Sequence, residues 1–216
     1  MSVVIILTST VFVNPIKHIY QNNKDDRIRA YLTAIKQWLE KTNFKIVLVE
    51  NSGYTFEELN EEKEKYKERF EVFTYKEDEL EESKHLVGNS SKGASEVFSI
   101  SYAFHKSQFV TPSSFIIKIT ARYFIPSLES YLSYFDLNNY DCLTQNKRLR
   151  CEMVGCHYKH FSQVFNTSLL ENGRYDGHIE RVYQRRTSRY PNVLVCKQLY
   201  INKTMSGGSG FGYWTI

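Results

Sequence analysis

The chain has 216 residues, with 28 Lys and Arg against 24 Asp and Glu for a net charge of +4, and 42% of it is apolar. That length suits one large domain or two small ones, and the apolar content excludes a largely disordered chain. The chain holds 16 Tyr, 14 Phe and 2 Trp but only 10 Gly and 4 Pro. So few turn-forming residues argue against an all-β sandwich, which needs many tight turns.

No segment approaches the ~18 consecutive apolar residues that cross a bilayer. The apolar run near the start, Val3 to Leu7, is too short and lacks the basic flank of a signal peptide. We therefore expect no membrane span, a cytoplasmic location and reduced cysteines.

Continuous apolar runs are typical of strands buried on both faces, and apolar residues at every third or fourth position indicate helices. In chain order these patterns predict strand 3–7, helix 26–39, strand 45–49, helix 55–70, strand 70–75, helix 91–106, strand 115–120, helix 126–135, strand 141–144, helix 176–189 and strand 193–201. The helix over 55–70 begins with a capping-box sequence, Thr55 to Glu58. Half of the acidic residues lie in 55–85, so we place this helix, well solvated, at the edge of the domain.

Alternating strands and helices predict a single α/β domain over 1–216, with a mostly parallel, mixed sheet of about six strands flanked by helices. In such sheets ligands bind outside the carboxyl ends of the strands. Function is therefore expected in the polar residues that directly follow the strands: Thr8 to Thr10, Glu50 to Ser52, Glu77 to Glu79 and Thr120 to Tyr123.

Two groups of residues in the second half of the chain leave alternatives open. Cys151, Cys156, His157 and His160 are ligand types suited to zinc, but their spacing matches no standard structural site, so buried thiols and hydrogen-bonded histidines are preferred. The glycine-rich end, 204–216, is interpreted either as a flexible lid over a ligand or as a loose terminus.

Lys92 and Gly93 stand at the start of a predicted helix, and Arg122 directly follows a predicted buried strand. Helix N-termini expose unpaired N–H groups, and Lys and Arg supply positive charge, so a diphosphate across the strand ends could contact all three. The alternative is an exposed Lys92 and a structural ion pair for Arg122.

Together these segments resemble the GT-A fold of nucleotide-sugar-dependent glycosyltransferases. The similar stretches are Leu7 to Thr10, Val49 to Gly53, Ser91 to Glu96, Ile117 to Pro126 and Asp176 to Arg181. The first strand and the sequence KITARYFIP also resemble the small glycosyltransferase domain of chlorella viruses that builds glycans on the major capsid protein.

The resemblance implies a hexosyltransferase-type enzyme that moves a sugar from a UDP-type donor to a glycan or glycoprotein hydroxyl, in the host cytoplasm if the protein is viral. It places the nucleotide sugar on residues after the strands and at the helix start: Thr8, Ser9, Thr10, Glu50, Asn51, Ser52, Lys92, Gly93 and Arg122. Glu180 is the expected catalytic base of an inverting enzyme, with Asp176 as the alternative. In a retaining enzyme Glu180 would instead stabilise the oxocarbenium-like centre.

One departure concerns the metal. The family usually carries Asp-x-Asp at the end of the fourth strand, where this chain has Thr120-Ala121-Arg122. Either Asp78, after the third strand, helps to hold Mn²⁺ or Mg²⁺, or Lys92 and Arg122 neutralise the diphosphate without metal.

Two rival functions would use other features of the sequence. A nucleic-acid-binding module would use the basic run 185–189, but the net charge of +4 makes this weak, and we expect no nucleic-acid partner. A sugar nucleotidyltransferase would need a Gly-rich, Arg-containing loop after Leu7, which the chain lacks.

Overall fold

The computed structural model describes residues 2–17, 19–146, 150–205 and 211–216. Its centre is a seven-stranded sheet in the order β3-β2-β1-β4-β6-β5-β9, in which only β6 runs antiparallel to its neighbours. The strands are β1 (Ser2–Ser9), β2 (Lys45–Glu50), β3 (Phe70–Thr74), β4 (Ser114–Thr120), β5 (Cys142–Thr144), β6 (Met153–His157) and β9 (Val193–Val195). The predicted α/β domain with a mostly parallel, mixed sheet is confirmed, with one strand more than expected.

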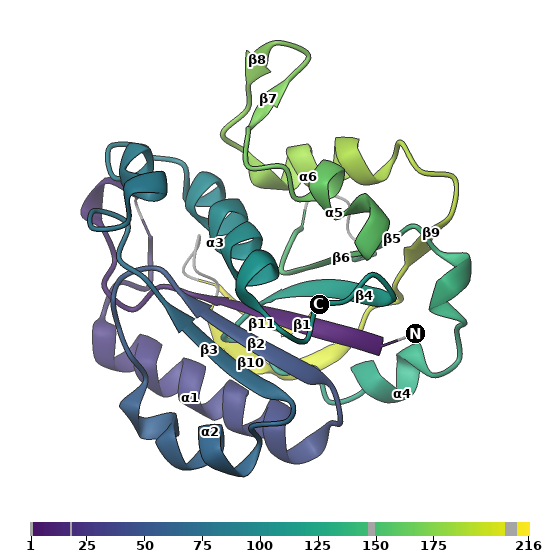
Figure 1. The fold of residues 1–216 in the computed structure, drawn as a ribbon, viewed down its shortest axis with the longest axis horizontal. Coiled ribbons are helices and arrows are strands. Elements are labelled where there is room, and N and C mark those ends of the chain that lie inside the picture. Colours follow the sequence, from purple (N-terminus) through teal and green to yellow (C-terminus); the bar gives the residue numbers. More distant parts are fainter. Residues whose placement is uncertain (1, 18, 147–149, 206–210) are drawn as a thin grey trace.

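Helices cover both faces of this sheet (Figure 1). The α-helices are α1 (Lys24–Lys41), α2 (Asn60–Lys65), α3 (Lys92–Lys106), α4 (Leu128–Leu132), α5 (Phe161–Val164) and α6 (Ile179–Thr187). Short 3₁₀ turns occur at Pro15–Lys17, Glu57–Leu59, Glu81–Leu86, Leu137–Asn139 and Tyr158–His160. One hydrophobic core lies on the side of α1 and α4 and the other on the side of α3, α5 and α6. Among the described residues, no helix combines the length and the apolar character that a membrane span requires.

A small hairpin, β10 (Tyr200–Met205) paired with β11 (Gly212–Thr215), closes the core on the α1 side. The single strand predicted over 193–201 is therefore wrong, because β9 and β10 belong to different sheets. Of the predicted lid, 206–210 lies outside the described residues, so the choice between a lid and a loose terminus stays a prediction.

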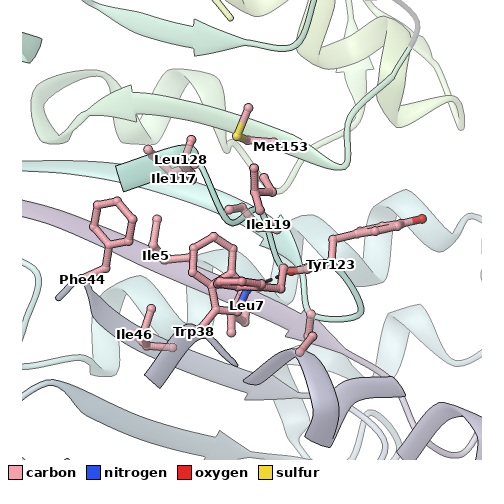
Figure 2. Close-up of a cluster of buried hydrophobic side chains, with 14 of the residues drawn as sticks. Ile5, Leu7, Trp38, Phe44, Ile46, Ile117, Ile119, Tyr123, Leu128 and Met153 are labelled. Atoms are coloured by element: carbon pink, nitrogen blue, oxygen red, sulfur yellow. Dashed lines mark hydrogen bonds between the residues drawn. The ribbon is translucent and has the colours of Figure 1, made fainter. Parts of the chain in front are cut away.

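Trp38 of α1 joins this core to the loop after β4. Its side chain is fully buried, and Nε1 donates a hydrogen bond to the carbonyl oxygen of Tyr123 at 2.8 Å. Figure 2 shows this bond among the apolar side chains of β1 and β4, including Leu7 and Ile119. The loop that carries Arg122 is thus anchored to the hydrophobic core.

The helix predicted over 55–70 is much shorter than expected, since it comprises only a 3₁₀ turn and α2. Thr55 does not cap it, and Phe56 adopts a left-handed conformation with φ of 50°. Phe56 is fully buried, with its ring 5.0 Å from that of Tyr54. Packing of the aromatic rings therefore overrides the capping signal.

The sequence patterns missed β6, which contains Cys156. Gly155 in this strand lies so close to β4 that a Cβ atom there would stand 2.9 Å from the Ile116 carbonyl oxygen. Cys156 is fully buried, and burial raises its pKa well above the ordinary value. His160 Nε2 lies 2.9 Å from Asp141 Oδ1. These positions agree with the preferred interpretation of a buried thiol and a hydrogen-bonded histidine.

The basic run 185–189 forms ion pairs within the domain. A hairpin of β7 (Leu170–Glu171) and β8 (Arg174–Tyr175) projects beside α6 (Figure 1). Arg186 is buried under its base, with Nε 2.8 Å from Glu171 Oε1 and Nη2 donating to the Ser168 carbonyl at 2.6 Å. Arg189 contacts the same carboxylate from the surface, at 2.9 Å. These arginines hold the hairpin, which weakens the nucleic-acid hypothesis.

Replacing Arg186 with Met should destabilise the fold far more than replacing Arg189 with Met. The side chains of Arg186 and Glu171 are only 4% and 7% exposed, so losing Arg186 leaves the buried Glu171 carboxylate with only the exposed Arg189 and removes the donor to the Ser168 carbonyl, at about 3–5 kcal/mol. The exposed Arg189 should contribute no more than about 1 kcal/mol. Urea unfolding of both variants measures the difference. Equal losses would show that Arg186 does not anchor the hairpin.

Candidate active site

A cavity of about 570 Å³ opens at the carboxyl ends of β1, β2 and β4. The parallel register explains its place, because Ser9 pairs with Glu50 and Thr8 pairs with Thr120, so these strands end at one edge. The loops after β1 to β4, the first turns of α3 and α6, and Tyr213 of β11 supply its walls.

The loop after β1 is held by Arg27 of α1. Arg27 is 2% exposed, and its Nε donates to the Thr10 carbonyl while Nη2 donates to the Tyr31 hydroxyl, both at 2.6 Å. Burial lowers the pKa of Arg27, and the charge of Arg122 lowers it further. Two guanidinium groups therefore lie close together at the cavity wall.

Glu50 holds the loop after β2. Its buried carboxylate accepts hydrogen bonds from the backbone N–H groups of Val11 and Ser52, each at 2.8 Å, and of Tyr54 at 2.9 Å. Burial raises the pKa of Glu50, and these hydrogen bonds oppose the rise. Glu50 does not line the cavity, so we reassign it from ligand contact to holding the two loops in place.

Polar side chains form a chain of contacts across one wall. Thr10 donates to Asn51 Oδ1 at 2.6 Å, and Asn51 Nδ2 donates to Glu77 Oε1 at 2.9 Å. Glu77 Oε2 in turn lies 3.1 Å from Nζ of the buried Lys17. Glu77 is therefore engaged within the protein, and the hydroxyl and amide groups of this wall are fixed in place.

Positive groups gather on another part of the wall. Arg122 lies over the ring of Tyr123 at 5.6 Å, and its buried Nε has no hydrogen-bond partner among the described residues. Arg27, Lys92 and Arg122 all line the cavity, and within the described part of the chain none of them forms an ion pair. Such a group suits an anionic ligand rich in oxygen atoms.

The start of α3 packs directly on the start of α6 through Gly93. A Cβ atom on Gly93 would lie 2.4 Å from Cβ of Ile179, so only glycine allows this approach. The contact places Glu180, the residue after Ile179, on the cavity wall near Lys92.

The two predicted catalytic acids have different surroundings. Glu180 lines the cavity, whereas Asp176 does not. Asp176 is ion-paired with Arg185, and its hydrogen bond with Arg185 holds the pKa of Asp176 below the ordinary value. An ionised carboxylate engaged in this way is a poor proton acceptor, so the geometry favours Glu180 over Asp176.

A divalent metal can be tested against the acidic groups present. Asp78 lines the cavity and is 53% exposed, with Oδ2 3.4 Å from Lys76 Nζ. No cluster of three His, Cys, Asp or Glu side chains suited to a metal occurs among the described residues. Mg²⁺ commonly uses one or two carboxylates together with substrate phosphates and water, so Asp78 fits a metal that a diphosphate helps to bind.

Most of the predicted site residues meet in this one cavity: Thr8, Ser9, Thr10, Asn51, Ser52, Asp78, Lys92, Gly93, Arg122 and Glu180. Sequence reasoning missed several lining residues, including Lys17, Arg27, Glu96 and Tyr213. A signal existed for Glu96, since it lies one helical turn after Lys92. The sequence offered no comparable signal for Lys17 or Tyr213.

No protein-family model matches the chain, and no curated protein matches it by sequence. Solved structures do match. The glycosyltransferase GlyE of Streptococcus pneumoniae TIGR4 is 10% identical over 91% of this chain and 45% of its own, with a TM-score of 0.53. Residues 1–349 of Staphylococcus aureus TarS are 13% identical over 91% of this chain and 58% of that one, with a TM-score of 0.51. The chain thus spans about half the length of these structures and shares their GT-A-like fold.

Replacing Glu50 with Gln should destabilise the protein by about 2–4 kcal/mol, because the amide NH₂ would face backbone donors of Ser52 and Tyr54. The matched control is Glu79→Gln, at a 71% exposed side chain paired with Lys76, with an expected effect below about 1 kcal/mol. Thermal and urea unfolding of both variants measure this. Unchanged stability of Glu50→Gln would return Glu50 to the list of ligand contacts.

Proposed function

We propose that this protein transfers a sugar from a nucleoside diphosphate donor, with UDP as the nucleotide, to a hydroxyl of a glycan or glycoprotein. One observation carries the proposal. The guanidinium of Arg122 lines the same cavity as Arg27 and Lys92, and no carboxylate neutralises it among the described residues. A diphosphate supplies the anionic oxygens that Arg122 lacks, and GlyE, which shares the fold, is a glycosyltransferase.

The nucleoside would lie on the wall formed by the loops after β1 and β2. Thr8, Ser9, Thr10, Asn51 and Ser52 present hydroxyl and amide groups there. The hydrogen bonds from Thr10 to Asn51 and from Asn51 to Glu77 hold the Asn51 amide in one orientation. Fixed donors and acceptors of this kind suit the ribose hydroxyls and a base edge.

Mn²⁺ or Mg²⁺ would be held by Asp78 together with the diphosphate. A divalent ion in such a site neutralises charge that develops on the leaving diphosphate. Arg122 and Lys92 supply positive charge in the same cavity, whether or not a metal contributes.

The transfer step joins the acceptor hydroxyl to the sugar of the donor. The acceptor oxygen bonds to the anomeric carbon of the sugar, the bond from that carbon to the diphosphate oxygen breaks, and the electron pair stays on the diphosphate. In an inverting reaction Glu180 takes the proton of the acceptor hydroxyl. In a retaining reaction Glu180 would instead stabilise the oxocarbenium-like centre. The resemblance to the chlorella-virus domain extends the proposal to capsid glycans built in a host cytoplasm.

Calorimetry with UDP and uridine tests the diphosphate site. The wild type should bind UDP more tightly than uridine. Mn²⁺ should strengthen UDP binding to the wild type but not to a variant that lacks the Asp78 carboxylate. Arg122→Met removes a charge-assisted contact and should weaken UDP at least about tenfold while leaving uridine unchanged.

The control is Arg29→Met, which removes an exposed guanidinium on α1, outside the cavity lining. It should leave both affinities unchanged. An Arg122 variant that binds UDP as well as the wild type would contradict the diphosphate role. Equal UDP affinity in Mn²⁺ and in EDTA would exclude the metal role of Asp78.

Glu180→Gln should lower the rate of sugar transfer or donor hydrolysis about 100-fold or more, without weakening the donor, because glutamine cannot take the acceptor proton. Asp176→Asn is the matched control, since it changes a carboxylate on the same segment that faces Arg185 instead of the cavity. UDP release from UDP-glucose and UDP-galactose reports both rates. A larger loss in the Asp176 variant would transfer the base role to that residue.

A further inference from the structure

A fully buried lysine supports one carboxylate of the cavity. Lys118 of β4 is 0% exposed, and its Nζ lies 2.8 Å from Glu96 Oε1 and 2.7 Å from the Cys151 carbonyl oxygen. Burial acts to lower the pKa of Lys118, but the charge and hydrogen bond of Glu96, together with Cys151 and Glu152, outweigh it, and the pKa lies above the ordinary value. Glu96 is therefore held in place by a charged partner in the core, below the cavity surface.

The opposite side of Glu96 faces the cavity. Its Oε1 is buried against Lys118, yet the side chain keeps 21% exposure and lines the cavity. Glu96 follows Lys92 by four residues on α3, so the two side chains share one face of the helix, one turn apart. A sugar attached to a diphosphate beside Lys92 would reach Glu96.

Two other carboxylates, Glu152 and Glu180, line the same cavity as Glu96. Burial raises the pKa of Cys151, Lys118 opposes this, and the charges of Glu96, Glu180 and Glu152 raise the pKa further. The cavity lining therefore holds the carboxylates Glu96, Glu152 and Glu180 as well as basic groups, and Glu152 is already paired with Arg150 at 3.2 Å.

We infer that Glu96, held by Lys118, accepts hydrogen bonds from hydroxyl groups of the transferred sugar and selects a neutral hexose over an acidic one. The inference rests on the proposed function and names its donor class. With Oε1 held by Lys118, the Oε2 oxygen of the ionised carboxylate still has two lone pairs for hydroxyl groups and offers no donor. It therefore favours neighbouring sugar hydroxyls and repels the carboxylate of a uronic acid that lies against Glu96.

Binding measurements with four probes test this: UDP, UDP-glucose, UDP-galactose and UDP-glucuronate. The wild type should bind one of the two UDP-hexoses more tightly than UDP, and at least about tenfold more tightly than UDP-glucuronate. Glu96→Gln keeps an oxygen for Lys118 but places an amide donor in the side chain. It should bind UDP like the wild type, lose about tenfold in UDP-hexose affinity, and discriminate less against the uronate. Glu64→Gln, the same change on the exposed surface of α2, should change nothing.

The outcomes separate this inference from the proposed function. A wild type that binds neither UDP nor a UDP-sugar overturns both. A wild type that binds UDP while sugars add no affinity, or a Glu96→Gln variant that keeps the full preference for the hexose, overturns the role of Glu96 alone. If Glu96→Gln fails to fold, the wild-type comparison still decides, because equal or tighter binding of UDP-glucuronate contradicts an acidic sugar pocket.

Discussion

β1 lies between β2 and β4, in a register that aligns Ser9 with Glu50 and Thr8 with Thr120. Helices cover both faces of this strand, so Val4 to Leu7 are completely buried and must all be apolar. Apart from Lys118 of β4, which is paired with Glu96, the polar residues at the carboxyl ends of these strands begin where the covering ends, at the same edge on all three strands. The position of the cavity is therefore a consequence of how the core is buried, since the hydrophobic runs stop where the polar loops meet.

The charged groups near this edge divide into two classes. Arg27, Glu50 and Lys118 are buried, and each has at least three polar partners in the protein, as a charge removed from water requires. They hold the loops and the Glu96 carboxylate in fixed positions. The second class, which includes Arg122 and Glu180, lines the cavity and keeps capacity for a ligand. The buried charges thus fix the frame in which the exposed ones act.

Burial decides which parts of the structure could be predicted from the sequence. Strands 3–7, 45–49 and 115–120 were predictable because doubly buried strands are continuous apolar runs, and the loops after them followed from the fold class. β6 was missed because Gly155 interrupts the apolar run that a buried strand usually shows. Whether Glu50 or its neighbour Asn51 faces the cavity depends on backbone donors from the β1 loop, about forty residues away in sequence. Arg27 was missed for the same reason, since its partner is the carbonyl of Thr10.

The choice between Glu180 and Asp176 also depends on contacts between residues that are distant in sequence. α6 begins where Ile179 packs on Gly93, and Ser91 Oγ donates to the Gly177 carbonyl at 3.0 Å. These two contacts join the beginnings of α3 and α6. The Arg186 ion pair with Glu171 then holds α6 to the hairpin that precedes it. On the proposed function, Lys92 at the start of α3 serves the leaving group and Glu180 at the start of α6 serves the acceptor. Because α3 packs on α6, the separation of these two positions is fixed before any ligand binds. A rigid separation of this kind is what oriented transfer between two bound molecules requires.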